Sequence, residues 1–279
     1  MKLTKNKLYI VSTPIGNLED ITFRALDVLK KSDIILCEDT RRSLKLINHF
    51  KIKKKLISYH KFNEKKKLSE IIEYINQGKI LSLISDAGTP LLSDPGNFLV
   101  NECLKNHIEI APIPGVSSIT AAMSVSGFKD HFLFYGFLPK KENELKKILS
   151  LLSEFSFSQV FFIPAQKINF YLKNFKNYYL GRKIMIAKEL TKIHEHFYRM
   201  DINDLKMFKS SIKGELTVVI SDQIKPKKIL NKGKIINRAK NLLKKYTLRD
   251  VVNMIMETEQ INKKEIYQIC LDIKNEKIT

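Results

Sequence analysis

The sequence predicts an α/β protein with two α/β domains in succession, followed by a small helical tail that resembles a helix-turn-helix. Short apolar runs alternate with helical patterns through the first half, as in βαβ units with a mainly parallel sheet. A charged linker near residues 137–141 precedes a second, smaller set of strands and helices. After residue 222 the strand patterns end. We therefore expect domains at residues 1–137 and 138–222, and a basic helical tail at residues 223–279.

The first half reads as strands separated by helices. The clearest helix covers residues 65–77, because Leu68, Ile71 and Ile75 share one face and Gly78 stands where a C-terminal cap is expected. The apolar runs between such helical patterns have the length of buried strands. These expected strands are residues 8–12, 34–37, 56–59, 80–85, 108–113 and 132–136.

The second segment repeats the alternation on a smaller scale. We expect its strands at residues 160–163, 184–189, 196–200 and 215–221. We expect its helices at residues 144–153, 168–175 and 201–209. The run at 196–200 is short and follows its neighbour closely, which favours a hairpin with the strand before it.

The tail contains two capping patterns, each followed by a helical stripe. Thr247 and Asp250 have capping-box spacing, as do Asn262 and Glu265. Two short amphipathic helices joined by a tight turn are typical of a helix-turn-helix, although a small helical bundle gives the same pattern. The surrounding lysines favour a nucleic-acid contact. Residues 224–234 read as a basic linker.

Composition narrows the class of protein. Hydrophobic residues make up 44% of the 279 residues, which excludes wholesale disorder, and no apolar run approaches the length of a membrane span. Three widely spaced cysteines and the lack of an apolar leader indicate a reducing cytoplasm. The net charge of +20 favours a polyanion such as RNA, but a sequence rich in Lys, Asn and Ile without Trp also indicates compositional bias.

Three loops at strand ends carry small residues and point to a ligand site. They are the stretches 12–18, 85–90 (SDAGTP, followed by DPG at 94–96) and 112–118. Ligands of open α/β sheets bind beyond the carboxyl ends of strands, although an ordinary turn into a helix would explain each loop alone. Ser117 and Ser118 offer hydroxyls and amides at a helix start. Neither G-x-G-x-x-G nor a P-loop motif is present.

An ordered series of motifs gives these loops a family resemblance. The motifs are TPIGNLEDIT at 13–22, EDTR at 38–41, HKFNE at 60–64, SDAGTP at 85–90, DPG at 94–96, GFLP at 136–139 and ELTK at 189–192. Together they resemble the tetrapyrrole methylase superfamily, and within it the enzymes that methylate ribosomal RNA. The resemblance implies a homodimeric enzyme with S-adenosylmethionine in a cleft between two α/β domains. Its implied substrate is a cytidine ribose 2′-hydroxyl in the decoding region of 16S rRNA, within the small ribosomal subunit.

The resemblance also implies site residues. On the first-domain side, the cofactor is expected to contact Pro14, Ser85, Asp86, Thr89, Ser117 and Ser118. From the second domain, Ile163 and Leu190 are expected to close the site.

A weak nucleophile such as a ribose hydroxyl benefits from a general base. The candidates for this base or for an orienting group are Asp39 with Arg41, His60, Glu64 and Glu189. The structural alternatives are an ion pair for Asp39 and Arg41, packing for His60, and a lysine partner for Glu189. We expect no metal, because nothing extends the pair of histidines around Glu195 into a ligand cluster.

The sequence departs from the family pattern after the strand at 160–163. Gln166 and Lys167 stand where a His and an Arg are usual, and Ile212 replaces a basic residue. Two alternatives therefore accompany the favoured function. The chain could be a methylase of a tetrapyrrole-like small molecule on the same scaffold, or an rRNA-binding assembly factor with weakened catalysis.

Overall fold

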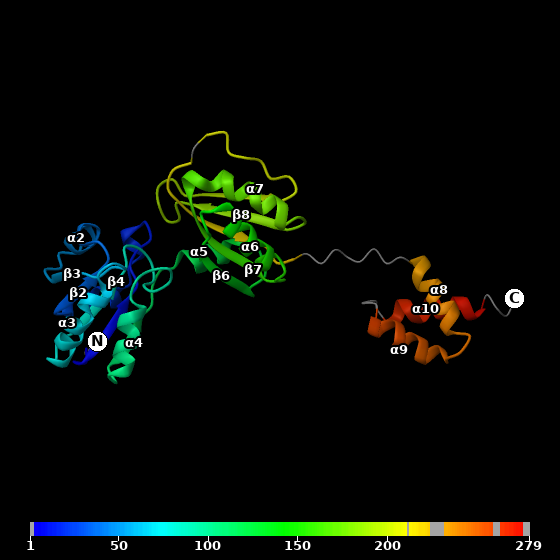
Figure 1. Cartoon of the computed structure of the whole chain (residues 1–279), viewed down its shortest axis with the longest axis horizontal. Helices are drawn as coiled ribbons and strands as arrows, with labels where there is room; N and C mark the ends of the chain where they lie inside the picture. The colour runs from blue at the N-terminus through cyan, green and yellow to red at the C-terminus, as the bar shows by residue number, and fades with distance from the viewer. Residues whose placement is uncertain (1–2, 211, 224–231, 259–262, 276–279) are drawn as a thin grey trace. The chain divides into compact units, whose positions relative to one another are not determined.

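The computed structural model describes residues 3–210, 212–223, 232–258 and 263–275. The chain forms two compact units, Met1–Ile224 and Lys225–Thr279. The first unit contains two five-stranded sheets that follow one another along the chain, drawn in blue to cyan and in green to yellow (Figure 1). None of the helices in the described ranges combines the length and the apolar character that crossing a membrane requires.

The first sheet is entirely parallel and has the strand order β3-β2-β4-β1-β5. This confirms the expected mainly parallel sheet. Its strands are β1 (Lys7–Val11), β2 (Ile34–Cys37), β3 (Lys55–Ser58), β4 (Leu81–Ile84) and β5 (Glu109–Ile113). All five carboxyl ends therefore lie at one edge, and the loops that leave this edge lie side by side.

Successive side chains of a strand point to opposite faces of this sheet, so each face has its own hydrophobic core. In β1, Leu8 and Ile10 pack with helices on one face, whereas Tyr9 and Val11 pack on the other. The first face carries α3 (Glu64–Asn76) and α4 (Asn97–Lys105). The second carries α1 (Phe23–Lys31) and α2 (Thr40–His49). Buried on both faces, the strands read as the continuous apolar runs seen in the sequence.

The second sheet is mixed, in the order β6-β7-β10-β8-β9. Its strands are β6 (Phe132–Phe137), β7 (Ser158–Pro164), β8 (Lys183–Lys188), β9 (His196–Asp201) and β10 (Glu215–Ile220). The expected hairpin is confirmed, because β8 and β9 pair antiparallel. We expected the run at 132–136 to continue the first series of strands, and this was wrong, because β6 pairs in parallel with β7.

The expected helix at 201–209 is also wrong. Residue Asp201 ends β9, and the chain then turns, with the Asp204 amide donating to the Asp201 carbonyl at 3.1 Å. The Ile202 amide donates to the Arg182 carbonyl at 2.9 Å, which ties the turn to the neighbouring strand. Ile202 and Leu205 are buried in the core. Their spacing of three residues looks helical in sequence, yet here it comes from a turn that points both side chains inward.

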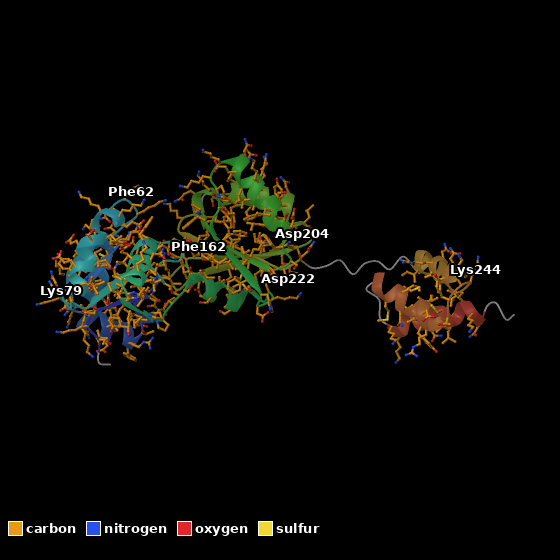
Figure 2. All side chains as sticks on the ribbon, turned by 60° about the horizontal axis from the view of Figure 1, so that its bottom comes forward. Phe62, Lys79, Phe162, Asp204, Asp222 and Lys244 are labelled. Carbon is orange, nitrogen blue, oxygen red and sulfur yellow. The ribbon has the colours of Figure 1, made fainter. Side chains whose placement is uncertain are left out.

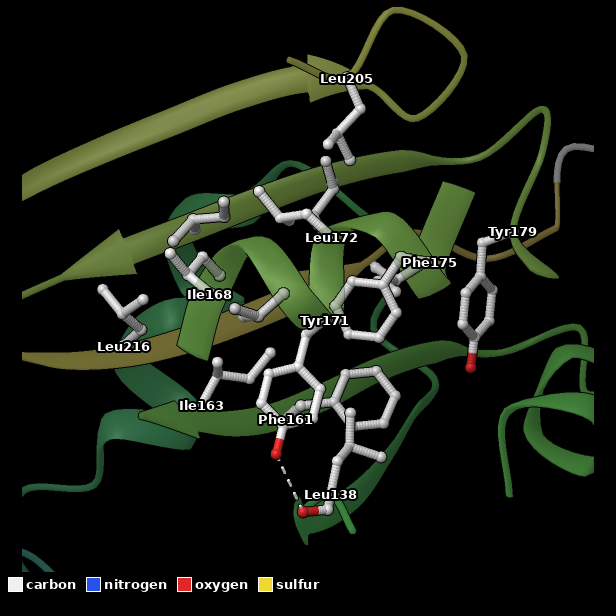
Figure 3. Close-up of a cluster of buried hydrophobic side chains, with 14 of the residues drawn as sticks. Leu138, Phe161, Ile163, Ile168, Tyr171, Leu172, Phe175, Tyr179, Leu205 and Leu216 are labelled. Carbon is white, nitrogen blue, oxygen red and sulfur yellow. Dashed lines mark hydrogen bonds between the residues drawn. The ribbon is translucent and has the colours of Figure 1, made fainter. Parts of the chain in front are cut away.

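Helices cover both faces of the second sheet. On one face, α6 (Glu142–Ser153) and α7 (Ile168–Tyr178) enclose a core of aliphatic and aromatic side chains, in which Tyr171, Phe161 and Phe175 lie close together (Figure 3). The Tyr171 hydroxyl donates to the Leu138 carbonyl at 3.4 Å. On the other face, α5 (Ser118–Ser126) packs through Ile119. Because α5 follows β5 directly, this packing holds the first sheet's loops against the second sheet.

The C-terminal unit is a cluster of three helices with its own core. These are α8 (Lys232–Leu242), α9 (Leu248–Thr258) and α10 (Lys263–Asn275), packed around Val251, Ile255 and Ile266. The capping pattern before α9 is confirmed, since the Asp250 amide donates to the Thr247 hydroxyl at 3.3 Å. The second capping pattern, at Asn262, and most of the expected basic linker lie outside the described residues. With α8 added, the arrangement is a small bundle rather than a pair of helices.

Candidate functional site

A cavity of about 570 Å³ lies in the first unit, where the carboxyl edge of the first sheet meets the second sheet. The loops after β2, β4 and β5 form one side. The other side comes from β6 and β7, and from residues after β8 and before β10. Such a place, beyond the carboxyl ends of parallel strands, is where open α/β sheets bind ligands. Its size fits a ligand as large as a nucleoside with a side arm.

Two loops of the first sheet are joined directly at this cavity. The Thr13 amide donates to the Gly88 carbonyl at 2.9 Å, and the Gly88 amide donates to the Thr13 carbonyl at 3.0 Å. Gly88 has φ +81°, and a Cβ there would lie 3.3 Å from Ile15 Cγ2. The Ser85 hydroxyl donates to the Ala87 carbonyl at 3.2 Å and thereby shapes the turn. The backbone can therefore approach a ligand closely at Ala87 and Gly88, which both line the cavity.

Hydroxyl groups collect on the same wall. The Thr89 hydroxyl donates to the Val116 carbonyl at 3.2 Å and lies 3.1 Å from the Ser12 hydroxyl, so this loop is tied to the loop after β5. Ser117 is the N-cap residue of α5, and within the described chain its hydroxyl makes no capping bond. Ser117 and Ser118 line the cavity at this helix start. Free hydroxyls and amides at a helix N-terminus suit a polar or anionic ligand group.

Carboxylates form a second polar wall. Asp86 accepts from the Asp39 amide at 3.2 Å and from Arg42 Nη1 at 3.1 Å. Burial, followed by the nearby charge of Glu38, raises the pKa of Asp94 to about 6. Burial and then Asp86 raise the pKa of Glu38 in turn. Four acidic groups line the cavity when Glu215 is included, beside one arginine, and their excess negative charge fits a ligand with a positive centre.

The opposite wall is mostly apolar, although Gln166, Glu215 and Thr217 also line it. Phe137 and Phe162 line it with ring centroids 5.4 Å apart. Phe162 lies where the two sheets of the unit meet (Figure 2). Ile163 and Leu190 continue the surface. An apolar wall facing hydroxyls and carboxylates suits an amphipathic ligand with a flat ring at one end and polar or cationic groups at the other.

The connection after β8 supports the cavity from the second sheet. Glu189 has φ +53°, and its Oε1 accepts from Lys192 Nζ and from the Glu215 amide, each at 3.0 Å. Burial acts to raise the pKa of Glu189, but the Glu215 amide and then Lys192 outweigh it, so the pKa is lowered. Gly214, with φ +103°, packs against this carboxylate. The Asn17 amide donates to Thr191 Oγ1 at 3.1 Å and joins the connection to the loop after β1.

The structure brings most of the expected cofactor residues together. Those lining the cavity are Asp86, Thr89, Ser117, Ser118, Ile163 and Leu190. Pro14 is buried immediately before the lining residue Ile15, and Ser85 is buried beneath the turn that it stabilises.

The expected catalytic groups lie around the cavity rather than in the lining of the described chain. Asp39 caps α2 and pairs with Arg41 at 2.7 Å, and hydrogen bonds from Arg41 lower the pKa of Asp39 to about 2. His60 belongs to a turn, with its Nδ1 accepting from the Phe62 amide at 3.2 Å. Glu189 is engaged by Lys192 and Glu215, as described above.

The lining also contains groups that were not expected from the sequence, among them Glu38, Arg42, Asp94 and Phe137. A signal for Asp94 existed, because it belongs to the DPG motif at 94–96 that follows the SDAGTP loop. Glu38 stands beside Asp39, which we preferred. Only the structure shows which of these two neighbouring carboxylates faces the cavity.

Comparisons with known proteins point to one family. The model of the family "Tetrapyrrole (Corrin/Porphyrin) Methylases" matches residues 7–206. The chain is 47% identical over 231 residues to the ribosomal RNA small subunit methyltransferase I of Mesomycoplasma conjunctivae, covering 82% of this chain and 95% of that protein. The same enzyme of Rickettsia prowazekii is 41% identical over 273 residues, with 96% and 97% covered. Among solved structures, a Thermus thermophilus uroporphyrin-III C-methyltransferase complexed with S-adenosylhomocysteine matches with a TM-score of 0.56 and 13% identity, over 78% of this chain and 98% of that one.

Proposed function

Because the chain belongs to the tetrapyrrole methylases, and among them to the ribosomal RNA small subunit methyltransferase I family, we propose that it methylates a cytidine ribose 2′-hydroxyl in the decoding region of 16S rRNA with S-adenosylmethionine. The observation that carries the cofactor assignment is the cavity, whose hydroxyls, carboxylates and apolar wall match the three parts of that molecule. The net charge of +20 supports a polyanionic substrate.

The residues present fit this cofactor. We assign the hydroxyls of Thr89, Ser117 and Ser118 to its polar groups, and the wall of Phe137 and Ile163 to its base. The adjoining carboxylates balance its positive sulfur. Once bound, the cofactor would supply an electrophilic methyl group, whose sulfonium sulfur leaves as a neutral thioether when the ribose oxygen attacks the methyl carbon in line.

The chain's own contribution is to position the ribose and to accept its proton. Holding the reacting oxygen near the methyl carbon lowers the barrier by several kcal/mol, because the two reacting groups are already oriented when the substrate is bound. We assign proton acceptance to Asp94, because it lines the cavity and its pKa of about 6 is close to the working pH. Arg42 holds Asp86 in place at 3.1 Å.

The candidates outside the lining receive supporting roles. We propose that Asp39 positions Asp86 through its amide, while Arg41 and His60 contact the substrate backbone at the rim. Glu189 stabilises the connection after β8 through Lys192. None of the four needs to exchange a proton with substrate in this scheme.

The test is methyl transfer from radiolabelled S-adenosylmethionine to small ribosomal subunits that lack the modification, followed by digestion to nucleosides. We expect label in 2′-O-methylcytidine. Label in uroporphyrinogen but not in the subunits would favour the small-molecule alternative. Tight subunit binding without any transfer would favour the assembly factor. Either outcome contradicts the proposal.

A further inference from the structure

Two phenylalanines are exposed on the cavity side of the first sheet. Phe62, in the turn between β3 and α3, is 94% exposed, and Phe98, in the first turn of α4, is 46% exposed. Figure 2 shows Phe62 at the surface of the molecule, away from the packed core. The Phe62 ring is therefore free to contact a partner, and the groups around it determine which partner that surface suits.

The turn that carries Phe62 is held by its own hydrogen bonds. The His60 amide donates to Asn63 Oδ1 at 2.8 Å, and Asn63 Nδ2 donates to the Ser58 carbonyl at 3.1 Å. The Phe62 amide donates to His60 Nδ1 at 3.2 Å, and the two rings meet edge to face at 6.0 Å. The backbone is therefore ordered although the phenyl group is exposed. Binding at this ring would therefore cost this protein little conformational entropy, because the turn that carries the ring is already ordered.

Phe98 is linked to the same surface. Lys65 Nζ lies 4.9 Å from its ring centroid, and Glu64 Oε2 accepts from the Gly96 amide at 3.3 Å, which joins the start of α3 to the start of α4. Lys65 and Phe98 thus lie together at the start of α3, directly after the turn that carries Phe62, and we call these three residues the aromatic platform.

The platform adjoins the cavity. Asp94, which lines the cavity, precedes Phe98 by four residues, with the buried Gly96 between them. At the end of β3, the Ser58 hydroxyl donates to the Glu38 carbonyl at 3.4 Å, and Glu38 lines the cavity. A substrate reaching into the cavity would pass over this edge.

Lysines flank Phe62 along the chain. Lys61, Lys65 and Lys66 are exposed, and Arg41 and Arg42 are exposed at the start of α2, where they pair with Asp39 and Asp86. Flat rings interspersed with cations are the combination that binds single-stranded RNA, because bases stack on the rings while the cations contact phosphates. Binding an apolar protein surface would not require so many positive charges.

We infer that the platform of Phe62 and Phe98 stacks unpaired bases of the ribosomal RNA next to the nucleotide in the cavity. This inference rests on the proposed function and specifies how the RNA strand is held. It assigns a role to Phe62 that the cavity alone does not require.

The experiment compares Phe62→Ala and Phe62→Tyr in the full-length protein. Binding to unmodified small subunits, KM and kcat for their methylation, and affinity for S-adenosylmethionine are measured for each. We expect Phe62→Ala to weaken subunit binding by roughly tenfold, as for loss of one stacked base, and Phe62→Tyr to restore it. Cofactor affinity and kcat stay unchanged, because Phe62 lies outside the cavity. Phe157→Ala is the matched control, since Phe157 is 46% exposed directly before β7, at the end of that strand opposite to the cavity.

Each other outcome overturns the inference. If wild-type protein methylates subunits and Phe62→Ala binds them equally well, the platform does not hold RNA. If Phe157→Ala is equally impaired, the loss is not specific to the platform. If Phe62→Ala instead changes the sedimentation coefficient while subunit affinity is kept, the surface joins two copies of the chain. Failure of the proposed function is distinguished from these, since wild-type protein would then transfer no label.

Discussion

Asp94 shows how one residue is adapted to the cavity at a cost in stability. Its folded pKa of about 6 lies above the ordinary value of 3.8, so folding favours the protonated form. The stabilisation is fully present below pH 3.8 and is lost as the pH rises through about 6. At neutral pH the ionised carboxyl therefore faces Glu38 and Asp86 unfavourably, with Arg42 as the nearby cation.

Replacing Asp94 with Asn should separate stability from activity. We expect Asp94→Asn to stabilise the protein at pH 7.5 by about 1 kcal/mol, a value reduced for solvent screening, because the buried charge is removed. The rate of methyl transfer should fall by about 10²-fold, and the decline in wild-type rate below pH 6 should disappear. Thermal unfolding and single-turnover rates from pH 5 to 8 measure both effects.

Asp204→Asn, at an exposed turn, is the control. Full activity in Asp94→Asn would remove it from proton transfer.

At the scale of elements, the connections after β8 and before β10 shape the cavity by backbone geometry. Gly214 lines the cavity, has φ +103° and packs on the Glu189 carboxylate. A methyl group at Gly214 would displace Glu189, and the bonds of Glu189 to Lys192 and the Glu215 amide would be lost.

Gly214→Ala and Gly181→Ala form a matched pair. Gly181 also has positive φ, at +79°, but among the described residues nothing lies within 4 Å of a Cβ placed there. Both variants should lose about 1 kcal/mol of stability through backbone strain, and Gly214→Ala should lose more, because the bonds of Glu189 are also broken. Only Gly214→Ala should also bind S-adenosylmethionine more weakly, by tenfold or more, as measured by calorimetry. Equal cofactor affinity in the two variants would show that the Glu189 contact does not shape the site.

The elements were largely readable from the sequence, and the exceptions have physical causes. Strands buried on both faces give clear apolar runs, which is why β2 appears at 34–37 as expected. The partner of β6 is not encoded in its own residues, because pairing with β7 depends on where the chain crosses from one sheet to the other.

The candidate site could be predicted from the sequence to a similar degree. Small-residue loops indicated the cavity, and six of the expected lining residues are there. The choice between Glu38 and Asp39 depends on which side chain faces inward after β2 ends, and Asp39 instead turns back to cap α2. The direction in which each of these two side chains points follows from the local path of the backbone and not from the residue type.

At the scale of the whole molecule, the chain combines a unit that contains the cavity with a basic helical unit that has its own core. Because each core is separate, removing residues 225–279 should leave the first unit folded. We expect unchanged affinity for S-adenosylmethionine and a several-fold higher KM for small subunits, with a weaker dependence of binding on salt. Titration at two salt concentrations measures this. Undiminished methylation of subunits would show that the helical unit does not contact the RNA.

A cofactor site in the cavity of the first unit is the basis of every role assigned above. Calorimetric titration of S-adenosylmethionine into the wild-type protein and into Ala87→Trp tests this most directly, because Ala87 is exposed and lines the cavity. Ser150→Trp, on the exposed surface of α6, controls for the added ring. We predict one bound cofactor per chain in wild-type protein and in Ser150→Trp, and none in Ala87→Trp with folding preserved. Equal binding by a folded Ala87→Trp, or no binding by the wild type, would contradict the account.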